Sequence, residues 1–109
     1  MLNQVVLVGR ICSDKPLEGE IEGNKITQIK LAIPRSYKNA DGVYDTDFIP
    51  VILRNLVADK TLEYCKKGDI IGVKGCLATF KKNDRDIIYL LGEKITFLSS
   101  GGGASQDDE

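Results

Sequence analysis

The stretch D-F-I-P-V-I-L-R-N at residues 47–55 combines an apolar alternation with two side chains that can do binding chemistry. Successive side chains of a strand point to opposite faces, so the alternate residues beginning at Ile49 would share one apolar face. The other face would then carry Phe48 and Arg54. A flat ring beside a guanidinium, both turned to solvent, suits a flat π-system or an anion better than a core.

Further aromatic and basic side chains fall on the predicted outer surface. Rings stack bases at about 1–3 kcal/mol per base, and cations neutralise phosphates with release of counterions. Tyr37, Phe48 and Phe80 are therefore the predicted stacking residues, and Arg54 would stack or pair with phosphate. The complete predicted site comprises Lys30, Arg35, Tyr37, Lys38, Phe48, Arg54, Lys74, Phe80, Lys81 and Lys82.

Each of these residues also has a purely structural interpretation. Phe48 could pack under a helix or loop, Tyr37 could brace a turn, and Phe80 could cover one end of the fold. Exposed lysines commonly serve only solubility. The remaining large aromatics are assigned to packing: Tyr44, Tyr64, Tyr89 and Phe97.

The sequence shows no catalytic machinery. It contains no histidine, which removes the commonest general base and most zinc ligand sets. It has no nucleophile elbow, P-loop or dinucleotide fingerprint. Three widely spaced cysteines without a C-x-x-C pair indicate reduced thiols. We therefore expect a non-enzymatic protein without a metal or other cofactor.

Composition indicates one soluble domain with a mildly basic centre. The 109 residues are 42% hydrophobic and 28% charged, and the formal net charge is -1. Residues 25–98 hold 13 basic and nine acidic side chains, a balance of +4. No signal peptide or membrane span is evident, so a cytoplasmic, nucleoid-associated protein is expected.

The elements that position these residues follow from the hydrophobic pattern. Strands are predicted at 2–11, 24–35, 47–54, 69–80 and 87–98, with a loop or ragged hairpin at 13–23. Asp41-Gly42 and Asn83-Asp84 mark turns. The first strand is apolar on both faces, so one face can cover the core while the other meets a second subunit.

One helix is expected at 55–67, capped by Asn55 and ending with Lys66, Lys67 and Gly68. Five strands with a helix between the third and fourth predict a mainly β OB-fold, a five-stranded Greek-key barrel, over residues 1–98. Gly72 and Gly75 suggest a bend or bulge in the fourth strand. Residues 99–109 read as a flexible Gly/Ser-rich acidic tail.

Several blocks of this sequence, in matching order and spacing, resemble the bacterial single-stranded-DNA-binding protein family. They are M-L-N-Q-V-V-L-V-G-R (1–10), L-A-I-P-R-S-Y-K-N-A-D-G (31–42), D-F-I-P-V (47–51), E-Y-C-K-K-G-D-I-I-G-V-K-G (63–75) and I-T-F-L (95–98). The resemblance implies an OB-fold that binds single-stranded DNA with little sequence preference and protects it during DNA replication, recombination and repair. It also implies a homotetramer, or a dimer through the first strand.

The chain departs from the family at several positions. Tyr37 and Phe48 match two of its stacking positions, whereas Arg54 and Lys82 replace aromatic residues at two others. Phe80, two residues before Lys82, could substitute for the second. The sequence has no tryptophan, and its acidic end lacks the closing Pro-Phe, which argues against recruitment of repair enzymes through the tail.

Two other functions remain open at this point. An OB-fold protein–protein assembly module, or a replication-restart accessory protein with weakened DNA binding, would explain the missing aromatics. A nuclease on the same barrel would need clustered acids. The acids near Arg85, Asp84 and Asp86, lie at a predicted turn, where solvated charges are the ordinary outcome.

Overall fold

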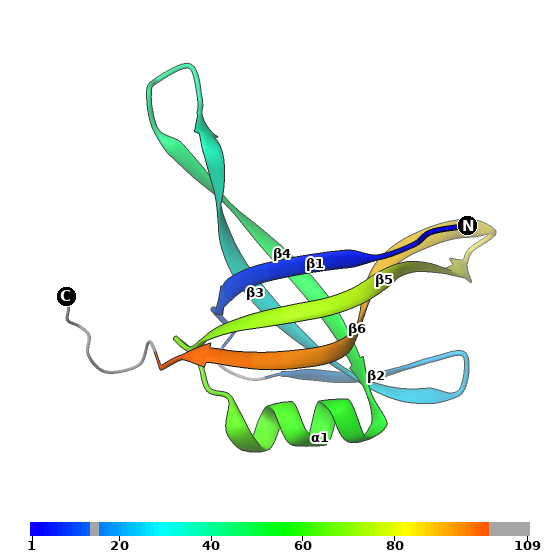
Figure 1. Ribbon diagram of the computed structural model, residues 1–109. Helices are drawn as coiled ribbons and strands as arrows, with labels where there is room; N and C mark the ends of the chain where they lie inside the picture. Colours follow the sequence, from blue (N-terminus) through cyan, green and yellow to red (C-terminus); the bar gives the residue numbers. More distant parts are fainter. Residues whose placement is uncertain (14–15, 101–109) are drawn as a thin grey trace.

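The computed structural model describes residues 1–13 and 16–100. In this part of the chain, six strands and one helix form a single curved sheet with a helix at one end (Figure 1). The elements are β1 (Val5–Ile11), β2 (Leu17–Ile21), β3 (Asn24–Lys38), β4 (Tyr44–Arg54), α1 (Asn55–Tyr64), β5 (Ile70–Lys82) and β6 (Arg85–Ser99).

The sheet closes into a small barrel. Its strand order is β1-β5-β6-β4-β3-β2, and an additional pairing joins β1 to β3. All neighbouring strands are antiparallel except β4 and β6, which are parallel over Ile52–Leu91 and Leu53–Gly92. A mainly β barrel with its helix between β4 and β5 confirms the predicted fold class.

The predicted number of strands was wrong, because the structure has six rather than five. The segment expected to be a loop or ragged hairpin contains β2, which pairs antiparallel with the start of β3. Glu22 and Gly23 turn the chain with φ of 50° and 81°. Glycine and glutamate are poor strand formers and this short strand is mostly exposed, which is why it is hard to detect from sequence.

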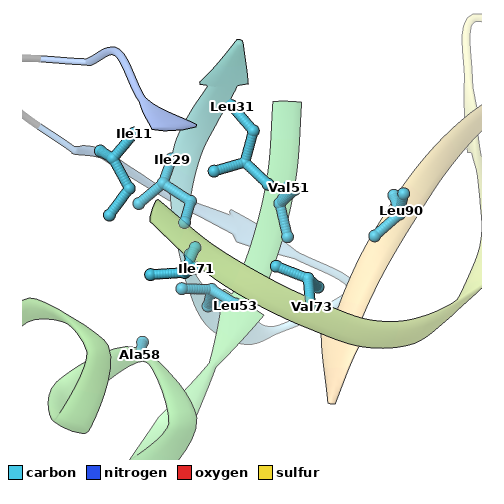
Figure 2. Packing of buried hydrophobic residues seen from close by; sticks show 9 residues of the cluster. All are labelled: Ile11, Ile29, Leu31, Val51, Leu53, Ala58, Ile71, Val73 and Leu90. Carbon is cyan, nitrogen blue, oxygen red and sulfur yellow. The ribbon is translucent and has the colours of Figure 1, made fainter. Parts of the chain in front are cut away.

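The barrel interior holds the main core (Figure 2). The inward alternation predicted for β3 and β4 is confirmed, since Leu31, Val51 and Leu53 are completely buried. Ile71 of β5 is equally buried. Gly75 allows β5 and β6 to approach, because a Cβ there would lie 1.9 Å from the Leu91 carbonyl oxygen. The β5–β6 register shifts between Lys74 and Gly75, so the predicted bulge is present.

A second, smaller cluster lies on the outside of the barrel. Ile26, Ile52 and Leu91 are buried there, with Ile21 and Tyr89 packed against them. The sequence pattern assigned Ile52 to a solvent-exposed face, but its side chain is only 6% exposed. The cause is the outward apolar face of the β2–β3 hairpin, which meets β6 above this position.

The helix boundaries differ from the predicted ones. Asn55 has φ of 52° and is the first helical residue, while Arg54 occupies the N-cap without a side-chain capping bond. The helix ends at Tyr64, and the Cys65 N–H donates to the Thr61 carbonyl. Gly68 is not the helix stop; with φ of 96° it lies in a following turn and donates its N–H to the Ile11 carbonyl.

Two hairpins extend beyond the barrel (Figure 1). We call residues 34–47 the β3–β4 arm and residues 76–91 the β5–β6 arm. The predicted turns are present in both: Gly42 has φ of 76°, and Asn83 and Asp84 have φ of 52° and 62°. Asn39 fixes the first turn, because its Oδ1 accepts the N–H groups of Asp41 and Val43.

The end of the last strand differs slightly from the predicted domain boundary. Ser99 belongs to β6 rather than to the predicted tail, and residues 101–109 lie outside the described part of the chain. Within residues 1–13 and 16–100, no helix has the length and apolar character needed to cross a membrane.

Candidate nucleic-acid interface

One continuous outer surface of β3 and β4 carries the strongest candidate residues, and we call it the exterior face. Ala32 pairs with Phe48, and Lys30 pairs with Pro50. Phe48 is 60% exposed although it lies in the middle of a strand. The predicted orientation of Phe48, away from the core, is confirmed. Arg54, three alternations further along β4, is also exposed.

The second cluster joins this face to the β5–β6 arm. Tyr89 packs against that cluster, and its ring lies 5.7 Å from the Phe80 ring at an interplanar angle of 59°. Both rings are half-buried. Lys82 alternates with Phe80 and so shares its strand face. Phe80 and Tyr89 thus form an aromatic pair, which we call the ledge. Tyr89 also packs against the second cluster, as its sequence assignment predicted.

A small cavity of about 90 Å³ lies at the edge of the exterior face. Arg54 and Tyr89 line it together with Glu22 and Asn24. A guanidinium and an aromatic ring thus border one hollow, which is the combination expected for the edge of a stacked base.

Lys38 and Tyr44 occupy the tip of the β3–β4 arm. The Lys38 ammonium lies 5.7 Å from the centroid of the Tyr44 ring. Tyr44 alternates with Thr46 and Phe48, so it shares the face of Phe48. It is 53% exposed, which corrects its assignment to packing. The two-residue spacing that relates Tyr44 to Thr46 and Phe48 could have revealed it from sequence.

Arg35 and Tyr37 lie on the opposite face of the β3–β4 arm. Arg35 binds the carboxylate of Asp47 through Nε and Nη2, both at 3.0 Å, and its Cζ lies 5.8 Å from the Tyr37 ring centroid. Because Asp47 and Phe48 are consecutive in a strand, they point to opposite faces. The structure thus does not place Tyr37 on the surface that holds Phe48.

Two predicted phosphate contacts lie elsewhere. Lys74 is exposed on β5, where it pairs with Val6 of β1 and Lys94 of β6. In the barrel, β6 lies between β5 and β4, and β1 lies between β5 and β3, so Lys74 is not next to the exterior face. Lys81 pairs with Asp86 at 3.3 Å on the side of the β5–β6 arm opposite Lys82. Neither contributes to the surface around Phe48.

The electrostatics of the site centre on Arg35. Its hydrogen bonds and charge hold the pKa of Asp47 below its ordinary value, and the carboxylate in turn raises the pKa of Arg35.

Elsewhere, burial and then the nearby Asp69 raise the pKa of Cys65, which keeps that thiol protonated at neutral pH. Among the described residues, no three His, Cys, Asp or Glu side chains are grouped as a metal ion would require.

Two further aromatics differ from their predicted packing roles. Tyr64 is 68% exposed at the end of α1, and Phe97 is 50% exposed on β6. Tyr64 belongs to α1 and Phe97 to β6, both outside the β3–β4 surface, so their exposure adds nothing to the candidate interface.

Comparison with known proteins gives a consistent result. The chain is 39% identical over 79 residues to single-stranded DNA-binding protein B of Bacillus subtilis, covering 72% of this chain and 70% of that protein. It is 32% identical over 119 residues to single-stranded DNA-binding protein 3 of Listeria innocua, covering 100% of this chain and 74% of the relative.

Two solved structures share the fold. They are the Plasmodium falciparum SSB complex with ssDNA, with a TM-score of 0.68 at 22% identity, and the mitochondrial protein Rim1 of S. cerevisiae, with a TM-score of 0.66 at 24% identity. Each match covers 91% of this chain and 96% of the other. The model of the single-strand binding protein family matches residues 2–88. This chain therefore belongs to the single-strand binding protein family.

Proposed function

We propose that this protein binds single-stranded DNA with little sequence preference, without acting as an enzyme. The observation that carries the proposal is the exposed ring of Phe48 in mid-strand, with Lys30 and Arg54 on the same face. The exposed ring offers a flat face for base stacking, and the two cations beside it can meet phosphates. Family membership supports the same conclusion.

The mechanism combines stacking with charge neutralisation. Bases stack on Phe48 and on the ledge formed by Phe80 and Tyr89, and Tyr37 offers a ring on the far side of the β3–β4 arm. Phosphates pair with the exterior-face cations Lys30, Lys38 and Arg54, and with Lys82 of the β5–β6 arm. Because every base has a π-face, such a surface binds sequence-tolerantly. No cofactor takes part.

A strand that reaches both Phe48 and Tyr37 has to pass around the β3–β4 arm. Wrapping of this kind removes the strand from bulk solvent, which suits protection of DNA during replication, recombination and repair. We accordingly place the protein in the cytoplasm, on the nucleoid.

We also propose that the protein is a homo-oligomer formed through β1. Val6 and Val8 are 65% and 53% exposed on the outer face of this strand. Among the described residues, β3 pairs only with Arg10 and Ile11 of β1, so the edge before Arg10 is open on that side. An apolar strand with an open edge is suited to pairing with a second copy. A dimer through β1, or a tetramer built from it, satisfies both features.

Titration of the protein with oligo(dT) at increasing salt tests the proposed function. We expect tight, length-dependent binding whose logarithm falls linearly with the logarithm of salt, by about 0.7 per phosphate contacted. Undetectable binding at low salt would instead favour an assembly module, and shortening of the oligonucleotide would indicate a nuclease.

A further inference from the structure

Arg35 is held on three sides within the β3–β4 arm. Its Nε and Nη2 both donate to the Asp47 carboxylate at 3.0 Å, so this edge of the guanidinium is already occupied by a protein acceptor. Its third nitrogen, Nη1, lies 3.8 Å from Asp45. The remaining flat side covers the Tyr37 ring. A guanidinium with this set of neighbours is oriented by the arm rather than offered to an anion.

The net charge of the β3–β4 arm also argues against phosphate binding by Arg35. Between residues 35 and 47, Arg35 and Lys38 supply two positive charges, and Asp41, Asp45 and Asp47 supply three negative ones. The balance is -1. The face with Asp45 and Asp47 therefore does not attract phosphate through its net charge, and what it offers to DNA is the Tyr37 ring, which is 62% exposed.

We propose that Arg35 is a positioning residue: held by Asp47, it covers one side of Tyr37 and fixes that ring so that a base stacks on the open side. This inference rests on the proposed DNA binding and adds to it a role for the Asp47 carboxylate. It also reassigns Arg35, which the sequence predicted to neutralise phosphate. Its contact with Tyr37 is a cation–π pair, with a further charge-assisted bond network behind it.

Asp47→Asn separates the two roles because they predict effects of opposite sign. The substitution keeps the shape of the side chain and removes one negative charge from a DNA-binding surface. If Arg35 binds phosphate, releasing it from Asp47 tightens oligo(dT) binding. If Arg35 positions Tyr37, loosening its anchor weakens binding, by about 2- to 5-fold for an exposed cation–π contact.

Asp41→Asn is the matched control. It removes the same charge from the same arm, at the exposed turn and away from Arg35, and an Asn-Gly pair suits the turn as well as Asp-Gly does. We expect oligo(dT) binding of this variant to be unchanged or slightly tighter than that of the unsubstituted protein.

Arg35→Lys and a Tyr37→Ala background complete the test. Lysine keeps the charge but lacks the planar fork, so we expect Arg35→Lys to weaken binding as Asp47→Asn does. In the Tyr37→Ala protein, Asp47→Asn has no ring left to loosen, and its weakening effect should disappear. A general loss of structure would persist in that background, and thermal melting of each variant checks the fold separately.

Three results would overturn the inference. Tighter binding by Asp47→Asn, to the extent seen for Asp41→Asn, would assign Arg35 to phosphate. Full binding by Arg35→Lys would show that charge alone suffices. Weakening by Asp47→Asn that persists without the Tyr37 ring would show a structural effect on the arm. Absence of oligo(dT) binding by the unsubstituted protein would instead remove the proposed function itself.

Discussion

The orientation of Phe48 follows from its position in the alternation of β4. Its neighbours Asp47 and Ile49 belong to the other face of β4, and its partner across the sheet is Ala32, which is too small to cover the ring. The ring is 60% exposed and belongs to neither buried cluster, so its face is open to a stacking base.

Replacing Phe48 by alanine should weaken oligo(dT) binding by about 1–3 kcal/mol and leave the fold intact, because the ring stacks a base and packs against little else. Fluorescence or gel-shift titration measures the affinity, and thermal melting measures stability. Ile52→Ala, on the same strand face but buried in the second cluster, is the control and should destabilise the fold by about 2–5 kcal/mol. Unfolding of the Phe48 variant would contradict the assignment of this ring to the interface.

At the scale of elements, the two arms depend on local backbone and charge features. The β5–β6 arm begins where Gly75 lets β5 cross closely over Leu91. The β3–β4 arm is fixed by the Asn39 turn at its tip and by the Arg35–Asp47 pair near its base. Neither arm has a large core of its own, so these features decide its shape.

Gly75→Ala should destabilise the domain by about 3 kcal/mol or more, since its Cβ would meet a backbone carbonyl oxygen that cannot move aside. Chemical denaturation measures the free energy of unfolding. Gly72→Ala is the matched control, because a Cβ there has only ordinary contacts at 3.8 Å or more. Equal stability of the two variants would show that β6 adjusts freely at Leu91.

The Arg35–Asp47 pair also predicts a dependence of stability on pH. Because Arg35 lowers the pKa of Asp47 from its ordinary 3.8, the pair stabilises the fold above that value, and the effect is lost as pH falls through the lowered pKa. The difference in Tm between the unsubstituted protein and Asp47→Asn should therefore be present at pH 7 and shrink as the pH falls through the lowered pKa of Asp47. A difference that stays constant on acidification would mean that the pair does not contribute through its charge. Both carboxylate and guanidinium are partly exposed, so high salt should also reduce it.

Much of this arrangement could be predicted from sequence, for identifiable reasons. The alternation of Ile29, Leu31 and Ile33 and the Asp41-Gly42 turn are local signals, and both were confirmed. Burial of Ile52 could not be predicted, because it depends on β2 and β6 meeting above it. The separation of Tyr37 from Phe48 was missed because the predicted strand ended at residue 35. The observed β3 continues to Lys38, so Tyr37 falls on the face opposite Lys38 and Phe48.

At the scale of the whole molecule, the two faces of β1 have different surroundings. Val5 and Leu7 pack against the core, whereas Val6 and Val8 remain exposed. A monomer would leave these valines and the open strand edge in water. The proposed dimer through β1 would cover both.

Val8→Glu should dissociate that oligomer, because it would bury a charge without a partner at the contact. Light scattering coupled to gel filtration measures the mass, against 12.0 kDa for one chain. Val43→Glu, at the exposed tip of the β3–β4 arm, is the control and should leave the mass unchanged. A variant with undiminished mass, or an unsubstituted protein that is already monomeric, would contradict the proposed contact.

The side chain of Asn3 forms a reciprocal pair with the backbone of Leu77, donating to its carbonyl at 2.7 Å and accepting its N–H at 2.9 Å. The amide thereby imitates a peptide group and extends the ladder between β1 and β5 past the end of the strand. Because this clasp forms so close to the start of the chain, a purification tag or fluorescent label fused ahead of Met1 would pull on the root of the β5–β6 arm.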